Sequence, residues 1–299
     1  MKFAENFKLR LSLLLFSPLW LFCQLLPYRT QLLLGKPLGR LLLHCKGRSY
    51  RTTIKNLQLC YPELSRKKRA ALLCKSYQSL GMAFMEMLMS WWLPTYKTNT
   101  LLAVYGREHV DNALKTHGVI LLSPHFNTLE LCGRLLSQYF DFAVMYRPQK
   151  IKLLDRLMYH YRKKYYTHII ARQEVRKTVK ALKEKKIVWY AADGDHGKQH
   201  SVFAPFFGIP AATLTGTSRI AKMSGAKVIP CFFYRRKNAR GYDLYLHPPL
   251  TDFPSHSLTQ DATRINQILE EAIRKAPEQY IWQYKRFKTR PAGEKRFYD

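Results

Sequence analysis

From about residue 100 to residue 280, short apolar segments alternate with segments of helical spacing. The runs "VILLS", "FAVMYR", "THIIA" and "IVWYAA" have the length of buried strands, and "KVIPCFFYRR" and "YDLYLHP" extend the series. Helices are expected over about 127–139, 150–165, 174–186, 215–225 and 261–280. The residues between "IVWYAA" and the helix at 215–225 are interpreted as a loop. Strands that alternate with helices predict an α/β domain with a mixed, largely parallel sheet.

The chain before residue 100 has a helical pattern. Residues 50–78 are basic and helical in spacing, and Ser65 stands at the N-cap position of "RKKRAALLCKSYQSL". The next stretch, residues 79–96, carries four methionines, two tryptophans and a single charge, Glu86. A surface against acyl chains and an ordinary buried helix both fit this composition, and taken alone it favours the buried helix.

At the N-terminus, an apolar run carries no charged residue between Arg10 and Arg29. It is at the short end for a membrane-spanning helix, and Pro18 is tolerated in such helices. No small-residue cleavage site follows, which argues against a signal peptide. Basic residues are more numerous after the run, which places the body of the protein in the cytoplasm. We therefore expect a membrane-anchoring helix in residues 1–30, spanning or interfacial rather than a soluble core helix, and a cytoplasmic-facing domain in residues 31–299.

The chain is strongly basic, with 50 Lys and Arg against 20 Asp and Glu and a formal net charge of +30. A surface of this sign attracts nucleic acid, an anionic membrane or an acidic protein. No aromatic and basic motif of a known nucleic-acid module accompanies the charge, so nucleic acid is not the expected partner. The six cysteines form neither a C-x-x-C pair nor a metal-ligand spacing, which indicates reduced thiols in a cytosolic-facing compartment, without a disulfide framework or a metal site built on cysteine.

The stretch "SPHFNTLE" lies where a predicted strand ends and a helix begins. Asn127 suits the N-cap, and Glu130 then falls at the third helical position, as in a variant of the capping box. The same geometry allows His125 to act as a general base, with Glu130 close enough to fix its tautomer. From the residues alone, capping and catalysis both remain open.

A second candidate cluster follows the strand "IVWYAA", where "DGDHG" begins at Asp193. Asp-Gly-Asp-His could hold a divalent cation, as in a metal-dependent glycosyltransferase, but no nucleotide-binding pattern accompanies it. Asp195 could equally cap backbone groups of a glycine-rich turn. Arg162, in "YRKKYY", and Arg147, just after a strand, are candidate anion ligands or ordinary solvated bases. In a parallel sheet, residues that follow strands gather at one edge, where sites form.

Several long segments together resemble the late acyltransferases of lipid A biosynthesis, the lauroyl/myristoyl acyltransferase family of Gram-negative inner membranes. His125 and Glu130 match the family's His-x-x-x-x-Asp/Glu signature, which is shared with glycerolipid acyltransferases. The more specific matches are "NLQLCYPELS", "YRPQKIKLLDRLMYHYR", "VWYAADGDHG", "SVFAPFFGIPAATLTGTSRIAKMSGA" and "APEQYIWQYKRFKTRP". They cover nearly the whole chain in order.

The resemblance implies a glycerolipid-acyltransferase-like α/β domain at the cytoplasmic side of the inner membrane, without a cofactor. The donor would be an acyl carrier protein thioester, and the acceptor a hydroxyl of a Kdo-bearing lipid A precursor. His125 would be the general base and Glu130 its orienter, with direct attack on the thioester because no G-x-S-x-G elbow or persuasive cysteine nucleophile is present. Arg162 would stabilise the oxyanion or bind a lipid phosphate, Asp193 would anchor Arg162 or orient substrate, and Arg147 is a similar candidate.

Two other functions remain open at the level of sequence. A glycerol-phosphate or lysophospholipid acyltransferase would use the same histidine on another acceptor. A membrane scaffold would tolerate the charge, but it would give no reason for His125, Arg162 and Asp193 to fall at the ends of strands and helices.

Overall fold

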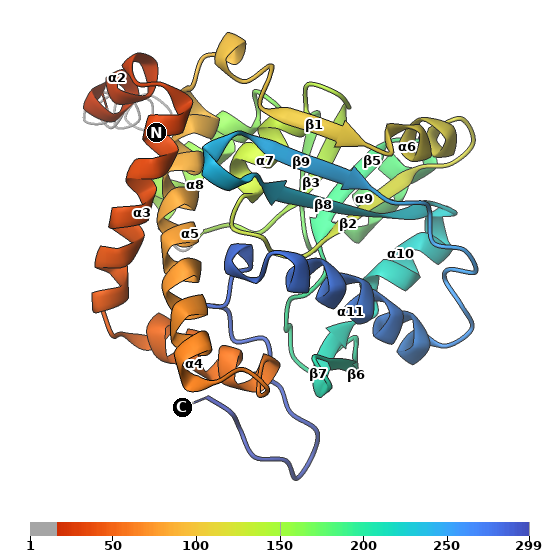
Figure 1. Cartoon of the computed structure of the whole chain (residues 1–299). Coiled ribbons are helices and arrows are strands. Elements are labelled where there is room, and N and C mark those ends of the chain that lie inside the picture. The colour runs from red at the N-terminus through yellow and green to blue at the C-terminus, as the bar shows by residue number, and fades with distance from the viewer. Residues whose placement is uncertain (1–16, 150, 299) are drawn as a thin grey trace.

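The computed structural model describes residues 17–149 and 151–298, and its centre is a seven-stranded sheet (Figure 1). The strand order is β1-β9-β8-β2-β5-β3-β4, and of the neighbouring pairs only β8 and β9 run antiparallel. The prediction of a mixed, largely parallel sheet is therefore confirmed. The strands are β1 Leu102–Tyr105, β2 Val119–Ser123, β3 Phe142–Tyr146, β4 His168–Ala171, β5 Ile187–Ala191, β8 Lys227–Arg235 and β9 Tyr242–Leu246.

The central strand β2 is buried on both faces because helices cover both sides of the sheet. Successive side chains of a strand point to opposite faces, so β2 contributes to two separate cores. Ile120 and Leu122 join the core under the C-terminal helices, while Val119 and Leu121 join the other core. The helices of the domain are α6 Arg107–Leu114, α7 Leu129–Leu136, α8 Lys152–Arg162, α9 Val175–Lys183, α10 Gly216–Ser224 and α11 Leu258–Lys275.

Two elements of the domain differ from the sequence-based expectation. Strand β1 was not predicted, and the segment interpreted as a loop contains an antiparallel hairpin, β6 Ser201–Phe206 with β7 Ile209–Leu214. The hairpin closes through Phe207 and Gly208, which both have positive φ, 52° and 74°. A tight turn of this kind needs positive φ at both positions, and a bulky Phe at the first position gives no turn signal in the sequence.

Four helices precede the sheet: α2 Ser17–Leu25, α3 Tyr28–His44, α4 Arg48–Cys60 and α5 Arg66–Trp92. Ser65 caps α5 as predicted, and its hydroxyl accepts a hydrogen bond from the backbone N–H of Lys68 (3.3 Å). Helices α3 and α5 lie side by side, where Gly35 faces Gly81 (Figure 1). A Cβ atom on Gly81 would lie 2.1 Å from the carbonyl oxygen of Gly35, so this approach of two backbones requires glycine.

The methionine-rich stretch is the second half of α5, which crosses the carboxyl end of β8. Met82 and Met89 are buried, which confirms the buried-helix interpretation. The lone charge of this stretch, Glu86, is buried too and pairs with Arg235, the last residue of β8, through two bonds of 2.7 Å. Tyr242 also donates a hydrogen bond to Glu86. This buried network fixes α5 to the edge of the sheet where β2 and β8 end.

Of the two forms expected for the N-terminal anchor, spanning and interfacial, a membrane-spanning helix is not found in the part of the chain that the structure describes. No helix within residues 17–149 and 151–298 is both long enough and apolar enough to cross a membrane. The first part of the expected anchor, residues 1–16, lies outside the described residues. The remainder forms α2, which ends at Leu25, and Pro27 precedes the start of α3.

Candidate active site

The candidate site forms where β2 and β5 end side by side. Ser123 pairs with Ala191 in the parallel register, and the backbone N–H of Ala192 donates to the carbonyl of Ser123 (3.2 Å). Continuing this register by two residues brings Asp193 opposite His125. The neighbouring strands therefore bring together two residues that lie 68 positions apart in the chain.

Asp193 holds His125 through both its ring and its backbone. Nδ1 of His125 lies 2.6 Å from Oδ1 of Asp193, and the backbone N–H of His125 donates to both carboxylate oxygens (3.1 and 3.2 Å). Because an ionised carboxylate can only accept hydrogen bonds, the ring proton belongs on Nδ1. Nε2 then carries the lone pair, and it has no hydrogen-bond partner among the described residues. The Asp193 side chain is 1% exposed and that of His125 is 45% exposed. The aspartate end of the pair is therefore buried, and the histidine end is open to solvent.

Both pKa values reflect this pairing. Burial alone would lower the pKa of His125, but the charge of Asp193 and the hydrogen bond to it raise that pKa above 6.5. Burial would raise the pKa of Asp193, but the charge of His125 and hydrogen bonds from His125 and Tyr280 lower it to about 2. Asp193 is therefore ionised at neutral pH, and His125 is a stronger base than a free imidazole.

Glu130 does not make the predicted contact with His125. Its carboxylate lies on the first turn of α7 and binds Arg162 at the end of α8, with Nε of Arg162 3.3 Å from Oε2. The guanidinium of Arg162 also lies over the ring of Tyr146, 5.4 Å from its centroid. The expected contact between Asp193 and Arg162 is absent as well among the described residues. The reason is the strand order: β5 lies beside β2, so Asp193 takes the position at His125 that the sequence-based prediction gave to Glu130.

The capping interpretation of the same turn is also wrong. Thr128, not Asn127, occupies the N-cap position of α7, and its side chain makes no capping bond. The Asn127 side chain instead exchanges hydrogen bonds with Ser79 of α5 (3.0 and 3.1 Å) and accepts one from Arg235 (3.3 Å). The turn after His125 is thus fixed by the buried network of α5 and β8. In the sequence, the only signal of this network was a lone glutamate in an apolar helix.

The other predicted site residues lie nearby. Arg147 follows β3 and is exposed. The carboxylate of Asp195 accepts hydrogen bonds from the backbone N–H groups of Gly197 (3.0 Å) and Thr289 (2.6 Å), which confirms its capping interpretation. Within the described residues, no group of three His, Cys, Asp or Glu side chains is arranged to hold a metal ion.

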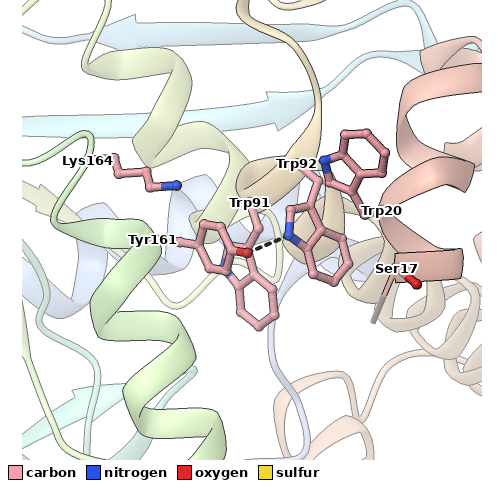
Figure 2. Close-up of a pocket in the computed structure, with 6 residues that line it drawn as sticks. All are labelled: Ser17, Trp20, Trp91, Trp92, Tyr161 and Lys164. Carbon is pink, nitrogen blue, oxygen red and sulfur yellow. Dashed lines mark hydrogen bonds between the residues drawn. The ribbon is translucent and has the colours of Figure 1, made fainter. Parts of the chain in front are cut away.

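An aromatic pocket of about 300 Å³ opens between α2, α5 and α8 (Figure 2). Trp91 stacks on Tyr161 with ring centroids 5.2 Å apart, and Trp92 donates a hydrogen bond to the Tyr161 hydroxyl (2.6 Å). Trp91 and Tyr161 also line a narrow crevice that reaches Glu130 and Arg162. The pocket and the ion pair of α7 and α8 therefore share a wall. The residues that line the pocket are Ser17, Trp20, Trp91, Trp92, Tyr161 and Lys164.

Comparison with known proteins places this chain in a family. The family model described as bacterial lipid A biosynthesis acyltransferase matches residues 4–289. The lipid A biosynthesis lauroyltransferase of Escherichia coli (strain K12) is 38% identical over 277 residues, 92% of this chain and 90% of the relative. The palmitoleoyltransferase of the same organism is 35% identical over 282 residues, 94% and 92% of the two chains. Its myristoyltransferase is 28% identical over 261 residues, 86% and 80% of the two chains.

Among solved structures, the 1-acyl-sn-glycerophosphate acyltransferase of Thermotoga maritima aligns with the chain. It covers 81% of this chain and 98% of its own, with a TM-score of 0.36 and 12% sequence identity. A likeness at this level carries no conclusion about substrate.

The family match defines an acyltransferase. The chain belongs to the bacterial lipid A biosynthesis acyltransferase family, and it acts in the acylation of lipid A.

Proposed function

We propose that this enzyme transfers a fatty acyl chain from an acyl carrier protein thioester to a hydroxyl of a Kdo-bearing lipid A precursor, with His125 as the general base. The observation that carries the proposal is the His125–Asp193 pair, whose Nδ1–Oδ1 distance is 2.6 Å. It leaves Nε2 of His125 unbonded among the described residues, on a half-exposed side chain at the edge of the sheet.

The proposed reaction begins when Nε2 of His125 takes the proton of the acceptor hydroxyl. The oxygen attacks the thioester carbonyl, and the tetrahedral intermediate collapses with loss of the C–S bond. The imidazolium then returns its proton to the leaving thiolate. Asp193, with a pKa of about 2, stays ionised throughout and stabilises the imidazolium. Burial raises the pKa of Cys132, on α7, well above its usual value, so this thiol is a poor nucleophile and direct attack is the simpler route.

Glu130 and Arg162 are proposed to act as a unit beside this reaction. Glu130 holds the guanidinium of Arg162 against the ring of Tyr146, and both charged side chains are largely buried. A guanidinium fixed in this way can stabilise an oxyanion or bind a lipid phosphate. The role of Glu130 in this proposal is to position Arg162, since Asp193 already orients His125.

The aromatic pocket is the proposed site of an acyl chain (Figure 2). Its volume of about 300 Å³ is at the lower end for ligand pockets, and its lining is mainly aromatic.

Trp20 is 47% exposed and lines the pocket without filling the protein core. Trp20→Ala should therefore change the preferred length of the acyl chain with little loss of stability. An unchanged ratio of products from thioesters of different length would exclude the pocket from chain selection.

Residues 1–30 and the exposed surface of α3 are proposed to attach the enzyme to the anionic cytoplasmic face of the inner membrane. Leu34 and Leu41 are exposed, and residues seven apart lie on nearly the same face of a helix. In α2, Leu25 is exposed as well, and Arg29 and Arg40 lie near these apolar side chains in the sequence. Apolar side chains with flanking basic residues favour an interface that carries negative charge.

The proposal is tested by mass spectrometry of a lipid A precursor incubated with acyl carrier protein thioesters. Wild-type enzyme should add one acyl mass, whose value also gives the chain length. His125→Ala should reduce the rate by about 10²- to 10⁴-fold. His117→Ala, in the half-buried turn between α6 and β2, is the matched control and should retain activity. Equal rates for wild type and His125→Ala would remove His125 from the mechanism. No transfer by wild type to lipid A precursor, but transfer to a lysophospholipid or glycerol phosphate, would favour that acceptor instead.

A further inference from the structure

Two arginines lie side by side at the edge of the sheet that carries His125. Tyr146 of β3 pairs with Ala171 of β4, and the backbone N–H of Arg172 donates to the carbonyl of Tyr146 (3.0 Å). Arg147 and Arg172 are therefore equivalent positions, one residue beyond two neighbouring parallel strands. Adjacent strands are about 4.8 Å apart, so the two side chains start close together and on the same face. We refer to Arg147 and Arg172 as the arginine pair.

The arginine pair has no carboxylate to neutralise it among the described residues. Two acidic groups in the adjoining segments are engaged elsewhere: Glu174 pairs with Lys177, and the Asp195 carboxylate accepts hydrogen bonds from Thr289. Both arginines are exposed. Like charges at neighbouring positions of a sheet are unfavourable, and a bound anion removes that repulsion.

His196, in the loop after β5, holds one member of the pair. Its Nδ1 lies 3.1 Å from Nη1 of Arg172 and accepts a hydrogen bond from it. Burial and the charges of Arg172, His125 and Arg147 all lower the pKa of His196, so it is neutral at pH 7 and adds no further positive charge. The imidazole lies against Gly194, where a Cβ atom would be 2.6 Å from Nε2. The loop that carries Asp193 therefore also binds Arg172, and His196 lies close enough to both Arg172 and His125 for their charges to lower its pKa.

We propose that Arg147 and Arg172 form a phosphate-binding site at the edge of the sheet beside His125, and that His196 positions Arg172 within it. Guanidinium groups bind phosphate through paired, charge-assisted hydrogen bonds, and two neighbouring guanidiniums match its charge. The identity of the molecule that carries the phosphate depends on the proposed function. In that reaction, the phosphate belongs either to the sugar of the acceptor or to the phosphodiester that links the acyl thioester to its carrier.

The test compares steady-state kinetics of the full chain for wild type, Arg147→Gln, Arg172→Gln and the double variant. Each single variant should raise KM for one substrate by about tenfold or more, because charge-assisted hydrogen bonds are lost, with a smaller change in kcat. A higher KM for the acceptor identifies its sugar phosphate, and a higher KM for the donor identifies the carrier's phosphodiester. Arg176→Gln, on the exposed first turn of α9, is the matched control. KM values within about twofold of wild type in all variants, or an equal rise in Arg176→Gln, would overturn the inference.

Binding of inorganic phosphate separates this inference from the proposed function. Phosphate should raise the Tm of wild type and of Arg176→Gln above the value in chloride of equal ionic strength, and it should do so less in the double variant. Gly194→Ala, which displaces His196 without removing an arginine, should weaken the effect too. A smaller phosphate-dependent rise in Tm in the double variant would support the site even if no lipid A precursor were acylated. Equal stabilisation of all variants would show that phosphate binds elsewhere on the basic surface, and would refute the site.

Discussion

Replacing Asp193 with asparagine removes the charge that faces His125 while keeping the size of the side chain. The pKa of Asp193 is about 2, against 3.8 for a free aspartate. A pKa difference of one corresponds to about 1.4 kcal/mol, so the interactions that favour ionised Asp193 exceed the cost of its burial by ~2 kcal/mol. Of the interactions that favour the ionised form of Asp193, the charge of His125 and the hydrogen bond with His125 are the largest. Most of this free energy should be lost in Asp193→Asn.

The sign of the pH dependence follows from the two pKa shifts. A lowered aspartate pKa stabilises the fold above about pH 4, and this contribution is lost as the pH falls from about 4 to about 2. The raised pKa of His125 gives a contribution that is complete below about 6.5 and is lost as the pH rises through the folded-state value. Denaturant unfolding should therefore show a loss of ~2 kcal/mol for Asp193→Asn near pH 5 to 6, which shrinks toward pH 2.

The same variant should change the pH profile of acyl transfer. His125 must be neutral to accept a proton, so kcat/KM of wild type should rise with pH through an inflection above 6.5. In Asp193→Asn, burial still lowers the pKa of His125 but the attraction of the carboxylate is gone, so the inflection should move below 6.5. The plateau should fall by about 10²- to 10⁴-fold, because an amide does not fix the proton on Nδ1.

Asp195→Asn is the matched control for this experiment. Asp195 lies in the same loop and is equally buried, but its carboxylate binds Thr289 and Gly197 rather than His125. It should lower stability and leave the inflection above 6.5. An inflection at the same pH in wild type and in folded Asp193→Asn would refute the assignment of Asp193 as the partner of a catalytic histidine.

Two further predictions concern the buried contacts of α5. Gly81→Ala should lower the free energy of unfolding by ~2 kcal/mol although alanine favours helices, because its Cβ would lie 2.1 Å from the carbonyl oxygen of Gly35. Gly216→Ala, where a Cβ meets nothing within 4 Å, is the control, and equal denaturant midpoints for the two variants would contradict this reasoning. Glu86→Gln should destabilise by ~3–5 kcal/mol, because it leaves Arg235 buried and without its ion-pair partner, and a loss below ~1 kcal/mol in urea unfolding would argue against that account.

The sequence determined the class of fold and the position of the site along the chain. Apolar runs such as Val119–Ser123 have the length and composition of buried parallel strands, and that local signal is enough to predict the strand–helix alternation. Because residues after parallel strands gather at one edge, His125 and Asp193 could be assigned to a site before their contact was known. The hairpin at 201–214 could not be predicted, because Phe207 has positive φ at the first turn position, where a bulky side chain gives no turn signal.

Only the tertiary structure decided which residues are partners. Proximity in the sequence predicted a contact between His125 and Glu130. The strand order instead places Asp193 beside His125, and Glu130 forms an ion pair with Arg162. Strand order is set by how the two cores close over the sheet, a non-local balance that no short motif encodes. The same holds for the arginine pair, whose members are 25 positions apart in the chain and adjacent in the sheet. Local sequence determines what each segment can form, and packing determines which side chains then meet.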